Sequence, residues 1–203
     1  MKMKNRVKFI YFDVGGVILR WRKVLYNIAE IHNKAFSDVE AVFSKHDTIA
    51  GKGVISAQQM WERMCKDLDI VERKVTDFAM LNMQSFTPIT ETHELLHNLV
   101  KIIPLGIITN AYLGFFNLGI KHGHVPDIPY SVVIESCNIG MIKPQPEIFA
   151  HAQKAAKVSA NHILFVDDYK ENILAARAMG WRALLFDTEN PEKSIRKIRE
   201  LIA

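Results

Sequence analysis

The sequence predicts an α/β fold in which a doubly wound parallel sheet carries an inserted helical segment. Beyond residue 87, apolar runs of strand length alternate with segments of helical length. Residues 20–86 show helical spacing and contain no convincing strand. Strands that alternate with helices are typical of a parallel sheet. We therefore predict a core domain made of residues 1–19 and 87–203, interrupted by a helical domain at residues 20–86.

The first expected element is a buried strand at residues 7–12, which is apolar and rich in aromatic side chains. It is followed by the glycine pair Gly15–Gly16, which indicates a tight loop. The next segment has apolar residues at helical intervals, such as Trp61, Met64, Cys65 and Leu68. A turn is expected at residues 51–53, and Ser56 is suited to cap the helix after it.

The second part of the chain alternates regularly between helices and strands. Helices are expected at residues 91–101, 111–121, 146–157 and 171–179, with a charged amphipathic helix at the end. Strands are expected at residues 103–109, 131–134, 163–166 and 182–186. Pro146 suits the first turn of its helix, and Gly180 suits the position just after the end of another.

The composition is that of a globular protein, because 49% of the 203 residues are hydrophobic and 24% are charged. The net charge of +4 is dispersed, which fits a cleft for an anionic substrate but gives no support for a nucleic-acid partner. Cys65 and Cys137 are too few for a disulfide framework and favour a reducing cytoplasm. With no signal peptide or membrane span in view, we expect a cytoplasmic monomer or homodimer without a membrane partner.

Polar side chains that could take part in catalysis or ligand binding lie at the expected carboxyl ends of the strands or in the loops after them. They are Asp13, Thr109, Asn110, Lys143, Asp167 and Asp168. In an open parallel sheet these ends share one edge, and ligands bind where the strand order reverses. Carboxylates gathered there repel one another unless a cation is present, and carboxylate and carbonyl oxygens suit Mg²⁺. The set therefore indicates a pocket for an anionic substrate whose developing charge must be neutralised.

Four segments, in this order and spacing, resemble the motifs of the haloacid dehalogenase superfamily of phosphatases and dehalogenases. They are residues 12–17 (FDVGGV), 107–110 (IITN), 140–144 (GMIKP) and 165–172 (FVDDYKEN). The resemblance covers nearly the whole chain, and the helical stretch between the first and second motifs looks like the small cap of that superfamily. It implies a Rossmann-like core with an inserted α-helical cap.

The resemblance also implies roles in phosphate ester hydrolysis. Asp13 would be the nucleophile that attacks phosphorus and forms an aspartyl-phosphate, which water then hydrolyses. Thr109 and the backbone of Asn110 would bind phosphoryl oxygens. Lys143 would bridge the nucleophile and the phosphate, keep Asp13 ionised and offset charge in the transition state.

The same resemblance implies a Mg²⁺ site in the pocket. Its ligands would be Asp13, the backbone carbonyl of Gly15 and Asp168. Asp167 would act through a water molecule or orient its neighbour. The alignment of Asn172 with the last motif sets this assignment of the acidic pair.

Gly15 departs from the phosphatase pattern. Phosphatases of the superfamily usually carry a second aspartate at this position, two residues after the nucleophile, where it protonates the leaving group and later activates water. General acid–base catalysis of this kind contributes roughly 10²–10⁴ in rate. We therefore expect a slow enzyme, one that prefers good leaving groups, or one that recruits an acid from the cap or the substrate.

The favoured function is a Mg²⁺-dependent phosphatase that acts on a small phosphorylated metabolite. One alternative is a haloacid dehalogenase, since dehalogenases of the superfamily also lack the second aspartate, although the pair Asp167–Asp168 argues for a phosphatase. Another alternative is a binding or regulatory module with poor turnover. Arg20, Trp21 and Arg22 follow the nucleophile loop and either contact the substrate or cover a hinge.

Overall fold

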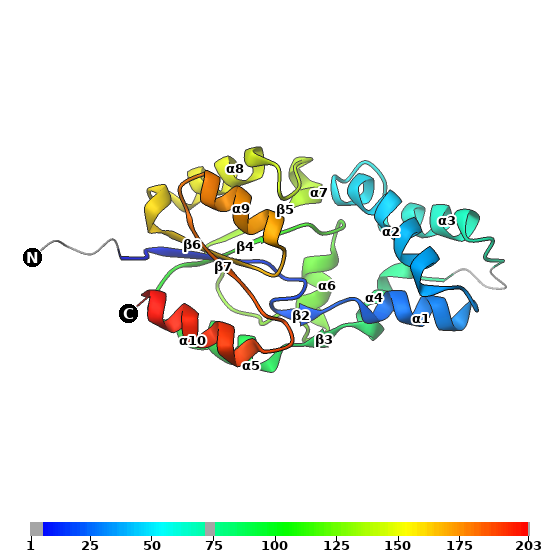
Figure 1. Ribbon diagram of the computed structural model, residues 1–203, viewed down its shortest axis with the longest axis horizontal. Coiled ribbons are helices and arrows are strands. Elements are labelled where there is room, and N and C mark those ends of the chain that lie inside the picture. The colour runs from blue at the N-terminus through cyan, green and yellow to red at the C-terminus, as the bar shows by residue number, and fades with distance from the viewer. Residues whose placement is uncertain (1–5, 72–75, 203) are drawn as a thin grey trace, which may run out of the picture.

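The computed structural model describes residues 6–71 and 76–202, and the parts of the predictions that fall on residues 1–5, 72–75 and 203 lie outside this range. Its centre is a parallel sheet with the strand order β5-β4-β1-β6-β7 (Figure 1). The strands are β1 (Phe9–Phe12), β4 (Leu105–Thr109), β5 (Val132–Glu135), β6 (Ile163–Asp167) and β7 (Arg182–Leu185). This arrangement confirms the predicted α/β class.

Helices cover both faces of the sheet (Figure 1). They include α5 (Thr90–Leu99), α8 (Pro146–Ala156), α9 (Lys170–Ala178) and α10 (Pro191–Ile202). In the central strand, Ile10 and Phe12 pack in the hydrophobic cluster that contains residues of α5 and α10. Phe9 and Tyr11 pack in the opposite cluster with residues of α8 and α9. Both faces of β1 are therefore buried, which explains its uninterrupted apolar sequence.

Two predicted starts in the core are too early, one by four residues and the other by two. The helix predicted at 111–121 is α6 (Phe115–Lys121), because Gly114 adopts a left-handed conformation with φ 80° immediately before it. The strand predicted at 103–109 begins only at Leu105, because the Ile103 amide still bonds to the carbonyl of Leu99 at the end of α5. The predicted position of Pro146 in the first turn of α8 is confirmed.

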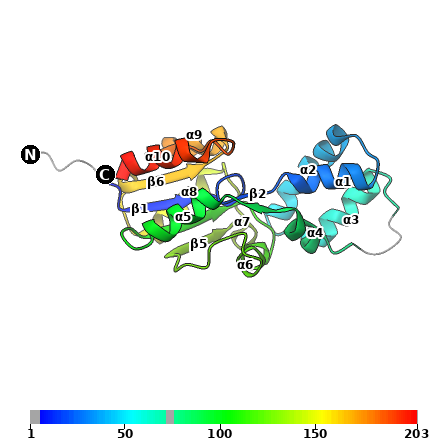
Figure 2. The same ribbon diagram turned by 90° about the horizontal axis from the view of Figure 1, so that it is seen from below.

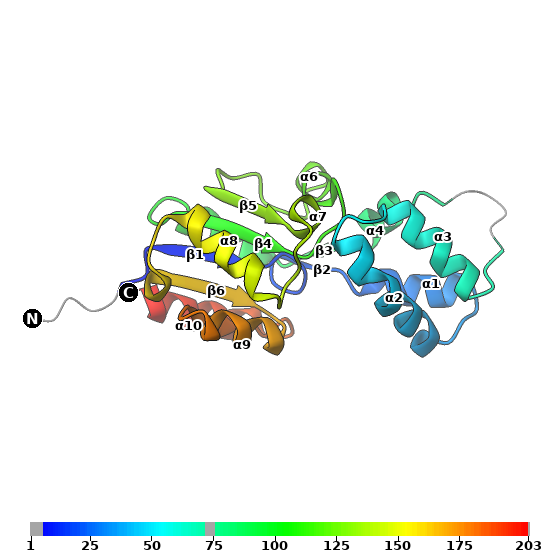
Figure 3. The same ribbon diagram turned by 90° about the horizontal axis from the view of Figure 1, so that it is seen from above.

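Residues 23–71 and 76–85 contain the helical insertion, which comprises α1 (Lys23–Ile31), α2 (Phe36–Gly51), α3 (Ala57–Asp67) and α4 (Phe78–Ser85). It lies beyond the carboxyl ends of the strands, at the end of the molecule opposite the start of β1 (Figures 2 and 3). Its apolar residues make a cluster of their own, which also takes in Tyr112 and Phe115 of the core. Ser56 caps α3 in a reciprocal pair of hydrogen bonds with Gln59, as predicted. The exact division into core and cap stays a prediction.

The two connections between the core and the helical insertion pair with each other, a feature that the sequence did not indicate. β2 (Leu19–Arg20) and β3 (Thr87–Pro88) form a short antiparallel ladder. Such a ladder holds the entry and the exit of the insertion side by side. Among the residues that the structure describes, no helix is long and apolar enough to cross a membrane.

Candidate active site

The acidic residues gather where the strand order of the sheet reverses. β1 pairs with β6 in parallel, and Phe12 lies opposite Val166, so the chain segments after these two positions leave the sheet together. Asp13 directly follows β1, Asp167 is the last residue of β6, and Asp168 comes next. The amide of Asp13 donates to the carbonyl of Val166 over 2.9 Å, which fixes the start of the loop after β1 on the neighbouring strand. This is the topological switch point at which parallel sheets bind ligands.

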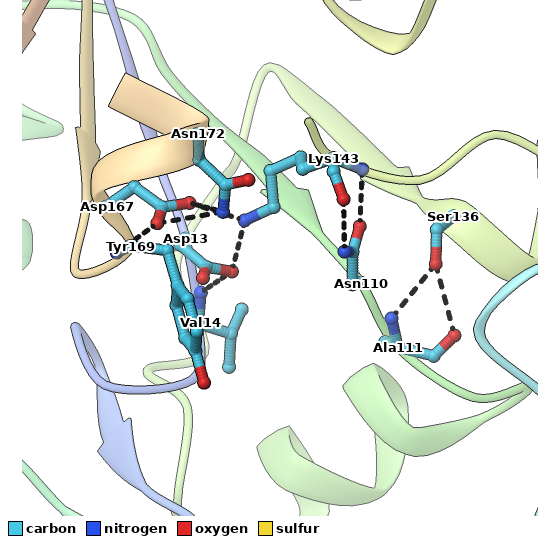
Figure 4. A network of polar contacts seen from close by, with 9 residues as sticks. All are labelled: Asp13, Val14, Asn110, Ala111, Ser136, Lys143, Asp167, Tyr169 and Asn172. Atoms are coloured by element: carbon cyan, nitrogen blue, oxygen red, sulfur yellow. Dashed lines mark hydrogen bonds and ion pairs between the residues drawn. The ribbon is translucent and has the colours of Figure 1, made fainter. Parts of the chain in front are cut away.

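Lys143 joins two of these carboxylates at the centre of the site (Figure 4). Its Nζ lies 2.8 Å from Asp13 Oδ1 and 2.7 Å from Asp167 Oδ2. The Lys143 side chain is 1% exposed, so water screens neither contact effectively. Asp13 Oδ1 also accepts a hydrogen bond of 2.7 Å from the amide of Val14, which fixes the orientation of the carboxylate.

Asp167 is fully buried and uses both of its oxygens in the protein. Oδ1 accepts from the amide of Tyr169 over 2.8 Å, and Asn172 Nδ2 donates to both oxygens over 3.0 Å (Figure 4). With Lys143 on Oδ2, these contacts give Asp167 a fixed orientation. Asn172 therefore orients Asp167.

Asp168 differs from Asp167 because one of its carboxylate oxygens has no hydrogen-bond donor within the described part of the chain. Its Oδ1 is buried, yet it accepts no hydrogen bond from any residue that the structure describes. Oxygens of Asp13, Asp167 and Asp168 lie within 4.8 Å of one another. A buried carboxylate oxygen without a donor, facing two other carboxylates, is satisfied by a cation. The donor set therefore fits a hard divalent ion such as Mg²⁺.

Charge and burial together shift the pKa values of Lys143, Asp13 and Asp168. Burial disfavours the Lys143 ammonium, but Asp13 and Asp167 outweigh this effect, so the pKa of Lys143 is raised. Burial also raises the pKa of Asp13, against the opposing effect of Lys143. Burial first, and then the charges of Asp13 and Asp167, raise the pKa of Asp168. One lysine does not balance three carboxylates, which again favours a bound cation.

The excess of carboxylates over cations predicts that, in EDTA, the thermal stability of the protein falls as the pH rises. The pKa of Asp168 rises from 3.8 to about 8 in the folded protein, so its protonated form is favoured by folding. The stabilisation is complete below about pH 4 and is lost as the pH rises through about 8. We expect the melting temperature to fall between pH 5 and about pH 8, and Asp168→Asn to flatten that fall. Parallel curves for the wild type and the variant in differential scanning calorimetry would contradict this cause.

Asn110 holds the loop that carries Lys143. Its Oδ1 accepts from the Lys143 amide over 2.8 Å, and its Nδ2 donates to the Lys143 carbonyl over 3.0 Å (Figure 4). Thr109, the last residue of β4, lines the same cavity and is 4% exposed. The side chain of Asn110 thus positions the lysine, a role that its place after a strand could not reveal.

Ser136 connects the loop after β4 to the helical insertion. Its hydroxyl accepts from the amide of Ala111 over 3.1 Å and donates to the carbonyl of Gly51, at the end of α2, over 2.5 Å. A second contact between the same regions joins Tyr112 Oη to Asp47 Oδ1 over 2.5 Å. No sequence signal marked Ser136, Asp47 or Tyr112, because their pairing depends on how α2 packs on the core.

The two glycines of the loop after β1 have different surroundings. Gly16 has φ +78°, and the carboxylate of Asp168 lies where a Cβ would be. Gly15 lies against Trp21, whose Cδ1 would be 2.9 Å from a Cβ at Gly15. The indole ring of Trp21 thus occupies the side-chain space at the position where phosphatases of the superfamily usually carry their second aspartate.

Arg20, Trp21 and Arg22, which were predicted to contact substrate or cover a hinge, do not all face the same cavity in the structure. Trp21 and Arg22 line a cavity of about 560 Å³ that also contains Asp13, Thr109 and Lys143. Arg20 is absent from this lining, and its Nη2 donates to the carbonyl of Thr188 over 3.0 Å, beyond β7. In this conformation Arg20 secures the connection to the insertion and does not face the cavity.

The fold and the cluster define a class of protein: a parallel α/β protein with a buried lysine–carboxylate site, suited to a cation, at the switch point of its sheet. Residues 10–186 match the family model described as haloacid dehalogenase-like hydrolase. The chain belongs to this hydrolase family, and the resemblance of its motifs is confirmed.

Two relatives illustrate the range of the similarity. A 70-residue segment is 36% identical to bifunctional epoxide hydrolase 2 of Rattus norvegicus; it covers 34% of this chain and only 13% of that protein. A sesquiterpene phosphatase of Aspergillus oryzae is 21% identical over 179 residues, which cover 88% of this chain and 89% of the relative.

Solved structures share the fold at low sequence identity. A family enzyme of Bacteroides thetaiotaomicron in complex with magnesium and inorganic phosphate superposes with a TM-score of 0.74 at 18% identity, over 90% of this chain and 95% of the other. L-2-haloacid dehalogenase of Xanthobacter autotrophicus, with chloropropionic acid covalently bound, gives a TM-score of 0.69 at 14% identity, over 89% and 77% of the chains. At these identities the likeness concerns the fold alone.

Proposed function

We propose that this hydrolase is a Mg²⁺-dependent phosphatase that forms an aspartyl-phosphate on Asp13 and acts on a small phosphorylated metabolite. The observation that carries the proposal is the arrangement around Lys143. Its ammonium touches Asp13 and Asp167, while Asp168 keeps a buried oxygen without a donor. Such a site is suited to a phosphate group, which brings negative charge and needs positive charge around it.

In this mechanism Asp13 attacks phosphorus with a carboxylate oxygen, and the bond from phosphorus to the leaving oxygen breaks. Lys143 favours the ionised form of Asp13 and offsets charge on the phosphoryl oxygens. Thr109 and the backbone of Asn110 bind the other phosphoryl oxygens. Water then attacks phosphorus and releases Asp13.

Asp13, the carbonyl of Gly15 and Asp168 would hold the Mg²⁺ ion, with Asp167 behind them as an orienting group. The bound ion would neutralise charge on the phosphoryl group. The fit rests on the free buried oxygen of Asp168 and on the oxygen-only donor set.

This division of labour predicts different effects at the two adjacent aspartates. Asp168→Ala should weaken Mg²⁺ affinity about a hundredfold or more, and Asp167→Ala about tenfold. Asp167→Ala should lower the melting temperature more, because Lys143, Asn172 and the amide of Tyr169 lose their acceptor. Calorimetric Mg²⁺ titrations and thermal melts of both variants check this, and a larger loss of Mg²⁺ affinity in Asp167→Ala would reverse the assignment.

Without a carboxylate at Gly15, the leaving oxygen must depart without a proton from that position. Aryl phosphates with acidic phenols should be cleaved faster than alkyl phosphates, by about 10²–10⁴. Gly15→Asp alone should not narrow this gap, because Trp21 occupies the space for the new side chain. The double variant Gly15→Asp with Trp21→Ala should narrow it. Single-turnover rates across a series of esters measure the gap, and equal rates in the wild type would mean that no proton is missing.

A dehalogenase is the second candidate, favoured by Gly15 and by the likeness in fold to L-2-haloacid dehalogenase. An assay with an aryl phosphate and with 2-chloropropionate, each with Mg²⁺ and with EDTA, separates the two. Phosphate release that requires Mg²⁺ supports the phosphatase. Chloride release that is indifferent to EDTA, without phosphate release, would overturn it in favour of the dehalogenase.

A further inference from the structure

The cavity wall that faces the acidic cluster is largely apolar. Its aromatic members come from α2, from α6 and from the residue that follows α4, so both the core and the helical insertion contribute. They include Phe43, Phe86, Phe115 and Phe116. Since the phosphate would lie at Asp13 and Lys143, this wall is where the rest of the substrate must fit. We infer that the substrate is the phosphate monoester of an apolar alcohol, an inference that rests on the proposed phosphatase function.

Two charged side chains of the wall, Arg22 and Asp47, are paired within the protein, and a third, Glu171 of α9, is exposed and carries a negative charge. Arg22 forms an ion pair with Glu40 of α2. Asp47 accepts the short hydrogen bond from Tyr112, and burial raises the pKa of this carboxyl group. An ionic substituent on the substrate would have to compete with the exposed pair of Arg22 and Glu40 or disturb the buried contact of Asp47 with Tyr112.

Two neutral polar side chains of the wall, Ser44 and Asn82, also have partners within the protein. The hydroxyl of Ser44 donates to the carbonyl of Glu40 over 2.8 Å. Asn82 Nδ2 donates to the carbonyl of Phe78 over 2.7 Å. A sugar or a nucleoside carries several hydroxyl or amide groups that would lose water on entering this wall, and each unsatisfied group costs about 1–3 kcal/mol. An apolar group carries no such cost.

The apolar wall begins directly beside the reacting groups. Trp21 packs against Gly15, and its ring stacks on Phe43 with centroids 5.5 Å apart and an interplanar angle of 26°. The indole therefore continues the wall from the nucleophile loop to α2. The first atoms of the leaving group would contact an aromatic surface. The volume of about 560 Å³ is that of a site for a small molecule.

A series of 4-alkylphenyl phosphates tests the inference, with ethyl, butyl, hexyl and octyl substituents. The alkyl group changes the acidity of the phenol very little, so differences in kcat/KM report burial of the chain. Each buried methylene is worth up to about fourfold. We expect kcat/KM to rise along the series until the cavity is full. A flat or falling series would overturn the inference.

A variant and a binding measurement complete the test. Phe43→Gln should reduce the gain per methylene, whereas Ile31→Gln, an exposed apolar position on α1, should leave it unchanged. Should Phe43→Gln fail to fold, the affinities of wild-type protein for methyl- and octylphosphonate decide the matter. We expect the octyl compound to bind tighter, and equal affinities would overturn the inference. If no ester is hydrolysed at all, the proposed phosphatase fails, whereas hydrolysis without a chain-length effect contradicts only the apolar substrate.

Discussion

Asp13→Asn should lower phosphatase turnover by at least about 10³-fold, because an amide keeps the shape of the carboxylate but is a poor nucleophile. Asp13 is the carboxylate that Lys143 and the Val14 amide both hold at Oδ1, so its orientation is fixed before substrate binds. No other acidic side chain is held in this way at the end of β1 among the residues described. Initial rates with an aryl phosphate at saturating Mg²⁺ measure the effect.

The variant should remain folded. Burial and the charge of Asp167 already disfavour the ionised form of Asp13, so removal of its charge relieves repulsion as well as breaking the contact with Lys143. Asp127→Asn, at an exposed position, is the matched control and should retain full activity. A folded Asp13→Asn enzyme with activity within tenfold of the wild type would contradict the assignment of Asp13 as the nucleophile.

Lys143→Met should be nearly as damaging as the loss of the nucleophile. The substitution leaves Asp13 and Asp167 buried without their shared cation, and breaking a buried ion pair costs about 3–5 kcal/mol of stability. Activity should fall at least about 10²-fold, since the charge that faces the phosphoryl group is lost. The pKa of Asp13 should rise further, so the residual activity should need a higher pH.

Thermal melts and pH–rate profiles check this expectation. Lys154→Met replaces an exposed lysine on α8 and is the matched control, with little expected change in either measurement. If Lys143→Met kept the acid limb of the wild-type pH profile, Lys143 would not be the group that favours ionised Asp13.

The sequence was sufficient to predict the sheet and the residues at its edge. Each apolar run that ends in a polar residue proved to be a strand or its end, and the parallel order brought Asp13, Asp167 and Lys143 together. This works because periodicity is a local property, and because parallel strands share the edge at which their carboxyl ends lie.

Contacts that depend on the three-dimensional path of the chain could not be predicted in this way. The short pairing of Leu19 with Pro88 joins segments separated by the whole helical insertion. The position of Trp21 against Gly15 depends on the turn at Gly16 and on the packing of α2. Arg20 turns toward Thr188 for the same reason. Arg20 and Trp21 are neighbours in the sequence but contact different parts of the molecule, and no local sequence pattern predicts this difference.

The most direct test of the central claim is to trap the phosphorylated enzyme. The protein is mixed with an excess of aryl phosphate and Mg²⁺, quenched in acid within the first turnover, digested and examined by mass spectrometry. We predict one added phosphoryl group on the peptide that contains Asp13, and none in EDTA or in Asp13→Asn. Phosphate release in the first turnover with no modified Asp13 peptide, or modification of another residue, would contradict the account.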